Sequence, residues 1–261
     1  MLGHGGAEVY RRGTYTRPGP EPRATEDAAI APARLATRVV ALAALVAAVA
    51  GCGGRQYEGD ARAILLEAKR VIDNSPGLHF ALSSTDAQGT GTLITGANGD
   101  AHRPDGFRGT LTVVQSGFNV KVNIISAQGY FYVQLPFTSS YQSTDPAQYG
   151  FGNPATLLDP NQGLSSLATS ALTAKLSDRD RYNGEELYEI DVTLPGDRVA
   201  ALLTSADKTQ TVTGRIGVNV DTHQIRKVVL TGPFFDKNRK STYTLVLDKY
   251  GENITITPPP A

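Results

Sequence analysis

The chain has 261 residues, and its 25 basic and 25 acidic side chains leave it without net charge at neutral pH. That balance excludes the strongly basic field on which nucleic-acid binding depends. Tryptophan is absent, and with only one cysteine, Cys52, the chain cannot form an internal disulfide bond.

Residues 39–52 form an apolar run, VVALAALVAAVAGC, that ends at the single cysteine. As a helix, its twelve apolar residues would span about 18 Å, too little for a hydrocarbon core of about 30 Å. Arg34 and Arg38 precede the run and small residues end it, a pattern typical of a secretory signal. We therefore interpret residues 49–52 (VAGC) as a lipobox.

On this interpretation, residues 1–52 are a leader and lipoprotein signal peptide that is cut before Cys52, and Cys52 carries the lipid. We then expect a protein anchored on the extracytoplasmic face of the cell membrane. An alternative is a buried core helix whose cysteine acts as a small hydrophobe, but no face of the run is polar. Residues 1–32 lack an apolar period, so either translation starts downstream of them or they form a disordered leader that is removed.

The remainder after Cys52 has 19 basic and 21 acidic residues, a net charge of −2, so no nucleic-acid partner is expected. Residues 53–59 are predicted to be a short tether, and residues 60–261 are long enough for a single domain with its own core. Residues 60–74 have apolar side chains at the i, i+3, i+4 spacing of an amphipathic helix, with Asp60 as its N-cap.

Beyond the helix the apolar period changes to two, which indicates strands. Short linkers such as Ser116-Gly117 predict antiparallel hairpins. A loop rich in Gly, Asp and Pro is predicted at 96–106. Strands are predicted at 78–84, 91–95, 107–115, 118–124, 130–135, 174–182, 187–194, 211–220, 225–231 and 242–250.

Helical segments interrupt these strands. Residues 154–173 predict two short helical pieces broken at Asp159-Pro160, and residues 196–206 predict a second amphipathic helix. Antiparallel strands with inserted helices indicate an α+β fold. We expect a curved antiparallel half-barrel sheet covered by helices on its concave face, because full closure into a barrel would leave the helices no face to cover.

Two motifs resemble an actinobacterial lipoprotein family that includes LppX, LprA, LprF and LprG. The family phrase Pro-x-x-[Val/Leu]-Leu-[Asp/Asn]-Pro-[Asp/Asn]-x-Gly-Leu is matched by residues 154–164, PATLLDPNQGL. A second phrase, Arg-Asp-x-x-Asn-Gly, is matched by residues 179–184. The chain departs from the family at Tyr250, where the family usually has tryptophan. The fold of that family is similar to the periplasmic lipoprotein carriers of Gram-negative bacteria.

The resemblance implies an internal apolar cavity that binds the acyl chains of a lipid or glycolipid and a role in moving them through the envelope. Such a cavity is expected to exceed about 1,000 Å³. On periodicity alone, the same residues are ordinary core. The candidate lining residues are Leu111, Val113, Phe118, Val120, Val122, Ile124, Leu157, Leu158, Leu167, Ile190, Val192 and Leu203.

Catalytic and metal-binding patterns are missing from the sequence. The histidines after Cys52 have no metal-ligand spacing, and no nucleophile elbow or phosphate-binding loop is present. We expect no enzyme activity and no cofactor. Besides the carrier hypothesis, two alternatives stay open: a ligand-free lipoprotein that binds an envelope transporter or sensor, and an envelope hydrolase.

Overall fold

The computed structural model describes residues 60–149 and 152–260, together with Gly19. The signal segment, the tether and Cys52 lie outside the described residues, so they stay predictions. Residues 56–261 group into one compact unit, to which the following description refers. In the described residues, no helix combines the length and the apolar character needed to cross a membrane.

Strands dominate this unit, and helices are short apart from the first. Two 3₁₀ turns, η1 and η2, and a two-residue strand, β6, complete it. In chain order the elements are α2 (Ala61–Asn74), β1 (Gly77–Ser83), β2 (Leu93–His102), β3 (Gly106–Gln115), β4 (Phe118–Ala127), β5 (Tyr130–Gln134), β6 (Gln142–Ser143), η1 (Pro146–Tyr149), η2 (Pro154–Thr156), α3 (Leu164–Thr169), β7 (Thr173–Tyr182), β8 (Glu185–Leu194), α4 (Gly196–Ala200), β9 (Val212–Asn219), β10 (Ile225–Asp236) and β11 (Arg239–Asp248).

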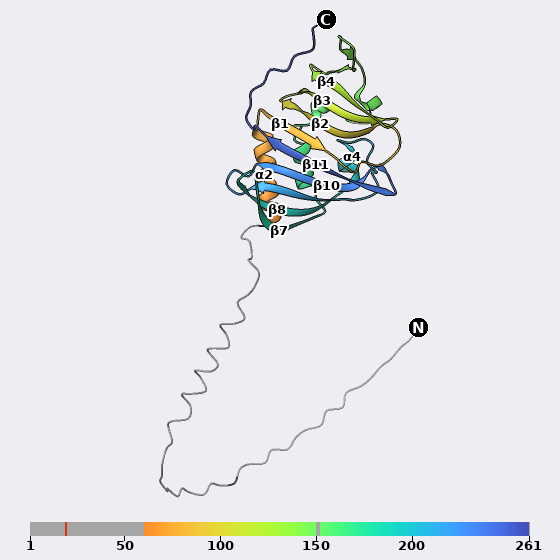
Figure 1. Cartoon of the computed structure of the whole chain (residues 1–261). Coiled ribbons are helices and arrows are strands. Elements are labelled where there is room, and N and C mark those ends of the chain that lie inside the picture. The colour runs from red at the N-terminus through yellow and green to blue at the C-terminus, as the bar shows by residue number, and fades with distance from the viewer. Residues whose placement is uncertain (1–18, 20–59, 150–151, 261) are drawn as a thin grey trace, which may run out of the picture. The chain divides into compact units, whose positions relative to one another are not determined.

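All eleven strands belong to one curved sheet (Figure 1) in the order β6-β5-β4-β3-β2-β1-β11-β10-β9-β8-β7. Every neighbouring pair is antiparallel, and β1 pairs with β11, which joins the two halves of the domain at the middle of the sheet. The sheet is open, since β6 and β7 are its edges. The predicted half-barrel is confirmed.

The predicted amphipathic helix is α2, which runs across the strands rather than along them (Figure 1). The carboxylate of Asp60 accepts a hydrogen bond of 2.9 Å from the amide of Arg62 and so caps the helix. Apolar residues on one side of α2, including Leu65 and Ile72, join the main core of the domain. That core lies between the helices and one face of the sheet, here called the inner face.

The predicted loop at 96–106 was wrong, because β2 continues through it to His102. Its glycines are required by close strand contact rather than by a turn. Gly99 pairs with Gly109 of β3, and a Cβ at Gly99 would collide with the carbonyl of Arg108. Glycine at both positions lets two strands approach where side chains would separate them.

The middle segment follows the prediction, with η2 and α3 on either side of Asp159-Pro160. The second predicted amphipathic helix is shorter than expected, because α4 ends at Ala200. The residues that follow include Thr204 and Ser205, which have low helix propensity. The chain turns there, and Leu202 and Leu203 pack against the main core.

Candidate functional site

An apolar pocket lies between the inner face of β1–β4 and the chain segment that crosses it. Its volume is about 190 Å³. The wall on the sheet side comes from β1–β4, β10 and β11, and the opposite wall from residues 152–164 and the turn after α4. The lining residues are Phe80, Leu82, Ile94, Ala97, Phe107, Leu111, Ile124, Gly152, Asn153, Pro154, Leu157, Leu164, Leu202, Leu203, Phe234, Tyr243 and Leu245.

The structure brings four of the candidate lining residues to this pocket: Leu111, Ile124, Leu157 and Leu203. Their part in lipid binding stays a prediction. Five further candidates are buried in the same core but line neither this pocket nor the smaller cavity described below: Val113, Val122, Leu158, Ile190 and Val192. Val120 is partly buried against that core.

Phe118 does not line the pocket. Its side chain is 73% exposed, because it is the first residue of β4 and follows directly on the turn at Ser116-Gly117. The alternation of the strand does place Phe118 on the same side as Val122. Phe118 therefore lies on the predicted face of the strand but is not buried there.

A second cavity of about 30 Å³ lies beside the first, between α2, α3 and the strands β8–β11. Leu167, another candidate, lines this second cavity. Leu164 and Leu245 line both cavities and therefore form the partition between them. The expected volume above 1,000 Å³ was wrong for this conformation, because Leu157 and Leu164 of residues 152–164, here called the covering segment, fill the concave space.

The covering segment is fastened to the sheet at its start. Asn153 accepts a hydrogen bond of 3.0 Å from the amide of Ala155 and thereby caps η2. The hydroxyl of Ser126, on β4, contacts the same side-chain oxygen at 3.3 Å. These contacts fix the point where the segment begins to cross the pocket.

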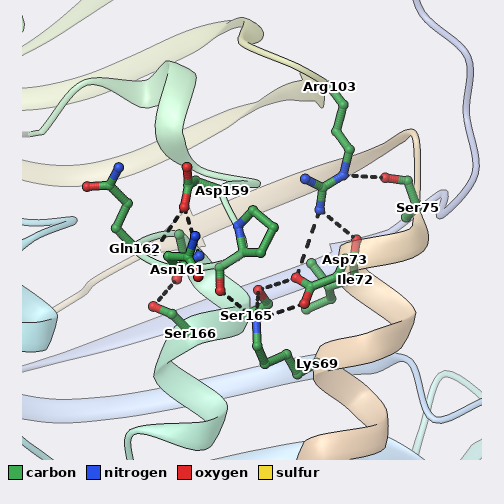
Figure 2. Close-up of polar contacts among 12 residues, drawn as sticks. Lys69, Ile72, Asp73, Ser75, Arg103, Asp159, Asn161, Gln162, Ser165 and Ser166 are labelled. Carbon is green, nitrogen blue, oxygen red and sulfur yellow. Dashed lines mark hydrogen bonds and ion pairs between the residues drawn. The ribbon is translucent and has the colours of Figure 1, made fainter.

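A second fastening joins the end of the segment to α2 (Figure 2). Asp73 accepts hydrogen bonds of 2.7 Å from Lys69 and 2.6 Å from the hydroxyl of Ser165. Lys69 also donates to the carbonyl of Pro160 at 2.5 Å. We call these four residues, Lys69, Asp73, Pro160 and Ser165, the polar clasp. Pro160 contributes its backbone carbonyl, so the clasp joins α2 to the turn that carries the family phrase.

The turn that leads into the clasp is itself stabilised by a carboxylate. Asp159 accepts hydrogen bonds from the amides of Asn161 and Gln162 (Figure 2), at 2.8 and 3.1 Å. These bonds hold the pKa of Asp159 below its usual range. On the other side of Asp73, Arg103 donates to the carbonyls of Ile72 and Ser75 and so closes the C-terminal end of α2.

The pocket is suited to packing against apolar groups rather than to proton transfer. Tyr243 is the one titratable residue among the described residues that line it, and its hydroxyl donates to the carbonyl of Ile94. Burial raises the pKa of Tyr243, so the phenol stays neutral. Among residues 60–149 and 152–260, no three His, Cys, Asp or Glu residues gather to hold a metal ion.

Sequence reasoning missed several wall residues. Phe80 and Leu82 lie on β1, a strand that the sequence does predict. Their position on its inner face could therefore have been predicted from the period-two alternation. Phe234 lies beyond the predicted end of its strand, because β10 continues past an irregularity in register after Gly232. Its ring meets that of Tyr243 edge to face at 5.1 Å, which forms one end of the pocket.

The fold and the pocket together define the class of architecture, an open antiparallel half-barrel with an apolar pocket on its inner face. Residues 60–256 match the family model described as LppX_LprAFG lipoprotein. The chain belongs to this family of lipoproteins.

Two kinds of relative support the assignment. The lipoarabinomannan carrier protein LprG of Mycobacterium tuberculosis (strain ATCC 25618 / H37Rv) is 24% identical over 239 residues, which cover 88% of this chain and 98% of the relative. The crystal structure of LprF from Mycobacterium bovis covers 77% of this chain and 97% of its own, with a TM-score of 0.61 and 14% identity. LppX from Mycobacterium tuberculosis covers 75% of this chain and 97% of its own, with a TM-score of 0.55 and 14% identity. These two structures support the fold.

Proposed function

We propose that this protein is a carrier that binds the acyl chains of a lipid or glycolipid in the pocket beneath residues 152–164 and helps to transfer them across the envelope. The observation that carries the proposal is the pocket itself, whose lining is apolar apart from Asn153 and the hydroxyl of Tyr243. The naming of LprG relatives as lipoarabinomannan carriers supports a glycolipid as cargo.

The energetics favour acyl chains as ligands. Burying one methylene group is worth about 0.8 kcal/mol, so a chain of about sixteen carbons supplies on the order of 10 kcal/mol before the costs of immobilisation. A volume of 190 Å³ is below the roughly 300–1,000 Å³ of sites that enclose small ligands. Binding a whole chain therefore requires the covering segment to move outward.

The structure offers a route for such an opening. Leu164 separates the two apolar cavities, and it lies next to Ser165, a residue of the polar clasp. Displacement of the segment between Asn153 and Ser165 would withdraw Leu157 and Leu164 from the concave space together. The sheet would keep its backbone hydrogen bonds, so the cost of opening is limited to the clasp and the displaced leucines.

The proposal includes a lipid anchor on Cys52, retained on the extracytoplasmic face of the cell membrane. The leader is cut off before Cys52, so that Cys52 becomes the first residue of the mature chain, residues 53–59 act as the tether, and residues 60–261 form the lipid-binding domain. A tether of seven residues extends at most about 25 Å, which keeps the pocket near the bilayer that supplies its cargo. An envelope transporter is the partner expected on the donor or acceptor side.

A second candidate function is a lipoprotein that carries no ligand and binds a transporter or sensor. The small volume of the pocket favours it, because a solid core is sufficient for such a role. The two candidates differ in whether purified protein contains lipid.

The test is organic extraction and mass spectrometry of the chain from Gly53 onward, after expression in an actinobacterial host. We expect stoichiometric acylated lipid in the extract. The same preparation should move a fluorescent acylated lipid between vesicles faster than buffer alone. A lipid-free protein that also takes up no added glycolipid would refute the carrier proposal and leave the second candidate.

A further inference from the structure

The opposite face of the sheet carries a groove that is separate from the apolar pocket. It spans β7–β10 and has a volume of about 800 Å³. On β8, Glu189, Asp191 and Thr193 line the groove and alternate with the core residues Ile190 and Leu194. The groove therefore lies on the outer face, with the sheet between it and the pocket.

Glu189 is the unusual residue of this groove. The residue as a whole is 9% exposed, and Ser177 donates to its backbone carbonyl, but within the described residues no hydrogen bond or ion pair to its carboxylate is found. The carboxylate leans over Gly217, where an added Cβ would lie 3.1 Å from the glutamate oxygen. Burial raises the pKa of Glu189, although Arg215 and Lys227 oppose that shift from a distance. The carboxylate opens onto the groove without a hydrogen-bond donor from the described residues, so its acceptor capacity is left to water or to a ligand there.

Hydroxyl groups form a row along one side of the groove. Thr173, Thr193, Thr213 and Thr231 are directly paired across four neighbouring strands. The hydroxyl of Thr173 donates a hydrogen bond of 2.9 Å to the hydroxyl of Thr193. Thr173 and Thr213 donate within the sheet, to the Thr193 hydroxyl and the Thr231 carbonyl, so the row presents mainly hydroxyl oxygens that accept, at the strand spacing of about 4.8 Å.

The charges of the groove balance. Lys175, Arg215 and Lys227 face Asp180, Glu189 and Asp191 in the same lining, and Arg215 already pairs with Asp191 at 2.7 Å. A cationic ligand at Glu189 would be repelled by Arg215 and Lys227. An anionic ligand would meet the carboxylate of Glu189 itself. A neutral ligand with many hydroxyl groups avoids both penalties.

We propose that this outer groove is a second binding site, for a neutral polyhydroxylated ligand such as an oligosaccharide. Ligand hydroxyls donate to the carboxylate of Glu189, and the ammonium group of Lys175 and the threonine row supply hydrogen bonds on either side. The site lies across the sheet from the proposed lipid pocket, so it is independent of that proposal.

The stability of the chain provides a first check. The pKa of Glu189 is raised in the folded state above its ordinary value, so folding favours the protonated form. Stability is therefore lost as pH rises from about 4.5 through the raised pKa. We expect the Glu189→Gln variant to gain stability relative to the wild type as the pH rises above about 4.5, as measured by urea denaturation. Glu186→Gln, an exposed neighbour on β8, should not show this gain.

The direct test titrates the purified full-length chain in detergent with mannotriose, arabinotriose and maltotriose, followed through the amide NMR signals of β8 and β9. We expect millimolar binding of at least one sugar, with shifts around Glu189 and Thr213. Glu189→Gln should weaken it about tenfold, the loss of hydrogen bonds to a charged group, whereas Glu186→Gln should not.

Three outcomes would overturn the proposal. One is the absence of binding by any of the three sugars up to about 20 mM. Another is equal binding by the wild type and Glu189→Gln. The third is tighter binding of trilysine or trigalacturonate than of the neutral sugars, which would assign the groove to a charged ligand. A variant with a blocked lipid pocket, Ala97→Trp, should bind the sugar normally, so failure here and failure of the carrier proposal are distinguishable.

Discussion

We expect the Ala97→Trp variant to retain less than about one tenth of the lipid that the wild type retains. Ala97 lies on β2 in the wall of the apolar pocket, and an indole there occupies space that the acyl chain needs. Exclusion of only two methylene groups weakens binding by about tenfold. The measurement is quantitative mass spectrometry of extracted lipid.

The chain itself supplies the control for this experiment. Asn98, the next residue of β2, points away from the pocket and is exposed, so Asn98→Trp adds the same side chain outside. The natural sequence has no tryptophan, so each variant carries a single indole. Its fluorescence should be shifted to the blue for Ala97→Trp and not for Asn98→Trp. Wild-type lipid content in a folded Ala97→Trp variant would show that acyl chains do not enter this pocket.

The second expected effect concerns the polar clasp. Asp73→Ala removes two hydrogen bonds to a carboxylate and leaves the buried hydroxyl of Ser165 without its acceptor. Because the Asp73 side chain is 22% exposed, we expect a loss of about 2 kcal/mol rather than the full value for two buried bonds. The melting temperature should fall by about 5 °C, as measured by circular dichroism of the lipid-free protein.

The same variant should take up lipid faster, because the clasp holds the covering segment over the pocket. Stopped-flow uptake of a fluorescent acyl lipid measures this rate. Glu67→Ala is the matched control on α2, since the exposed ion pair of Glu67 with Arg70 contributes little. If Asp73→Ala is destabilised but takes up lipid at the wild-type rate, the clasp is structural only and the segment does not open at this end.

Much of the fold was predictable, because apolar and polar residues alternate along every strand that has only one buried face. The alternation in residues 118–124 located β4, and the capping carboxylate of Asp60 located the start of α2. The failure at β2 has a specific cause. Gly99 and Gly109 are there for interstrand contact, which a single sequence does not distinguish from a loop.

The site was less predictable than the fold. Alternation identified the face of Leu111 and Ile124, but not whether a helix covers that part of the face, which is why Phe118 was misplaced. Ala97 was missed because alanine carries little weight in an apolar pattern, although its small size is what leaves the pocket open. The partition at Leu164 depends on packing between segments far apart in the chain, and no local pattern encodes it.

Photocrosslinking tests the central claim most directly. A lipid with a diazirine at mid-chain is bound to the protein, irradiated, and the adducts are mapped by peptide mass spectrometry. We predict adducts on β2–β4 and on residues 152–164, with Leu157 and Leu203 among the labelled positions. Labelling confined to the outer face of the sheet, or no labelling of a protein that has bound lipid, would contradict an acyl-chain site beneath the covering segment.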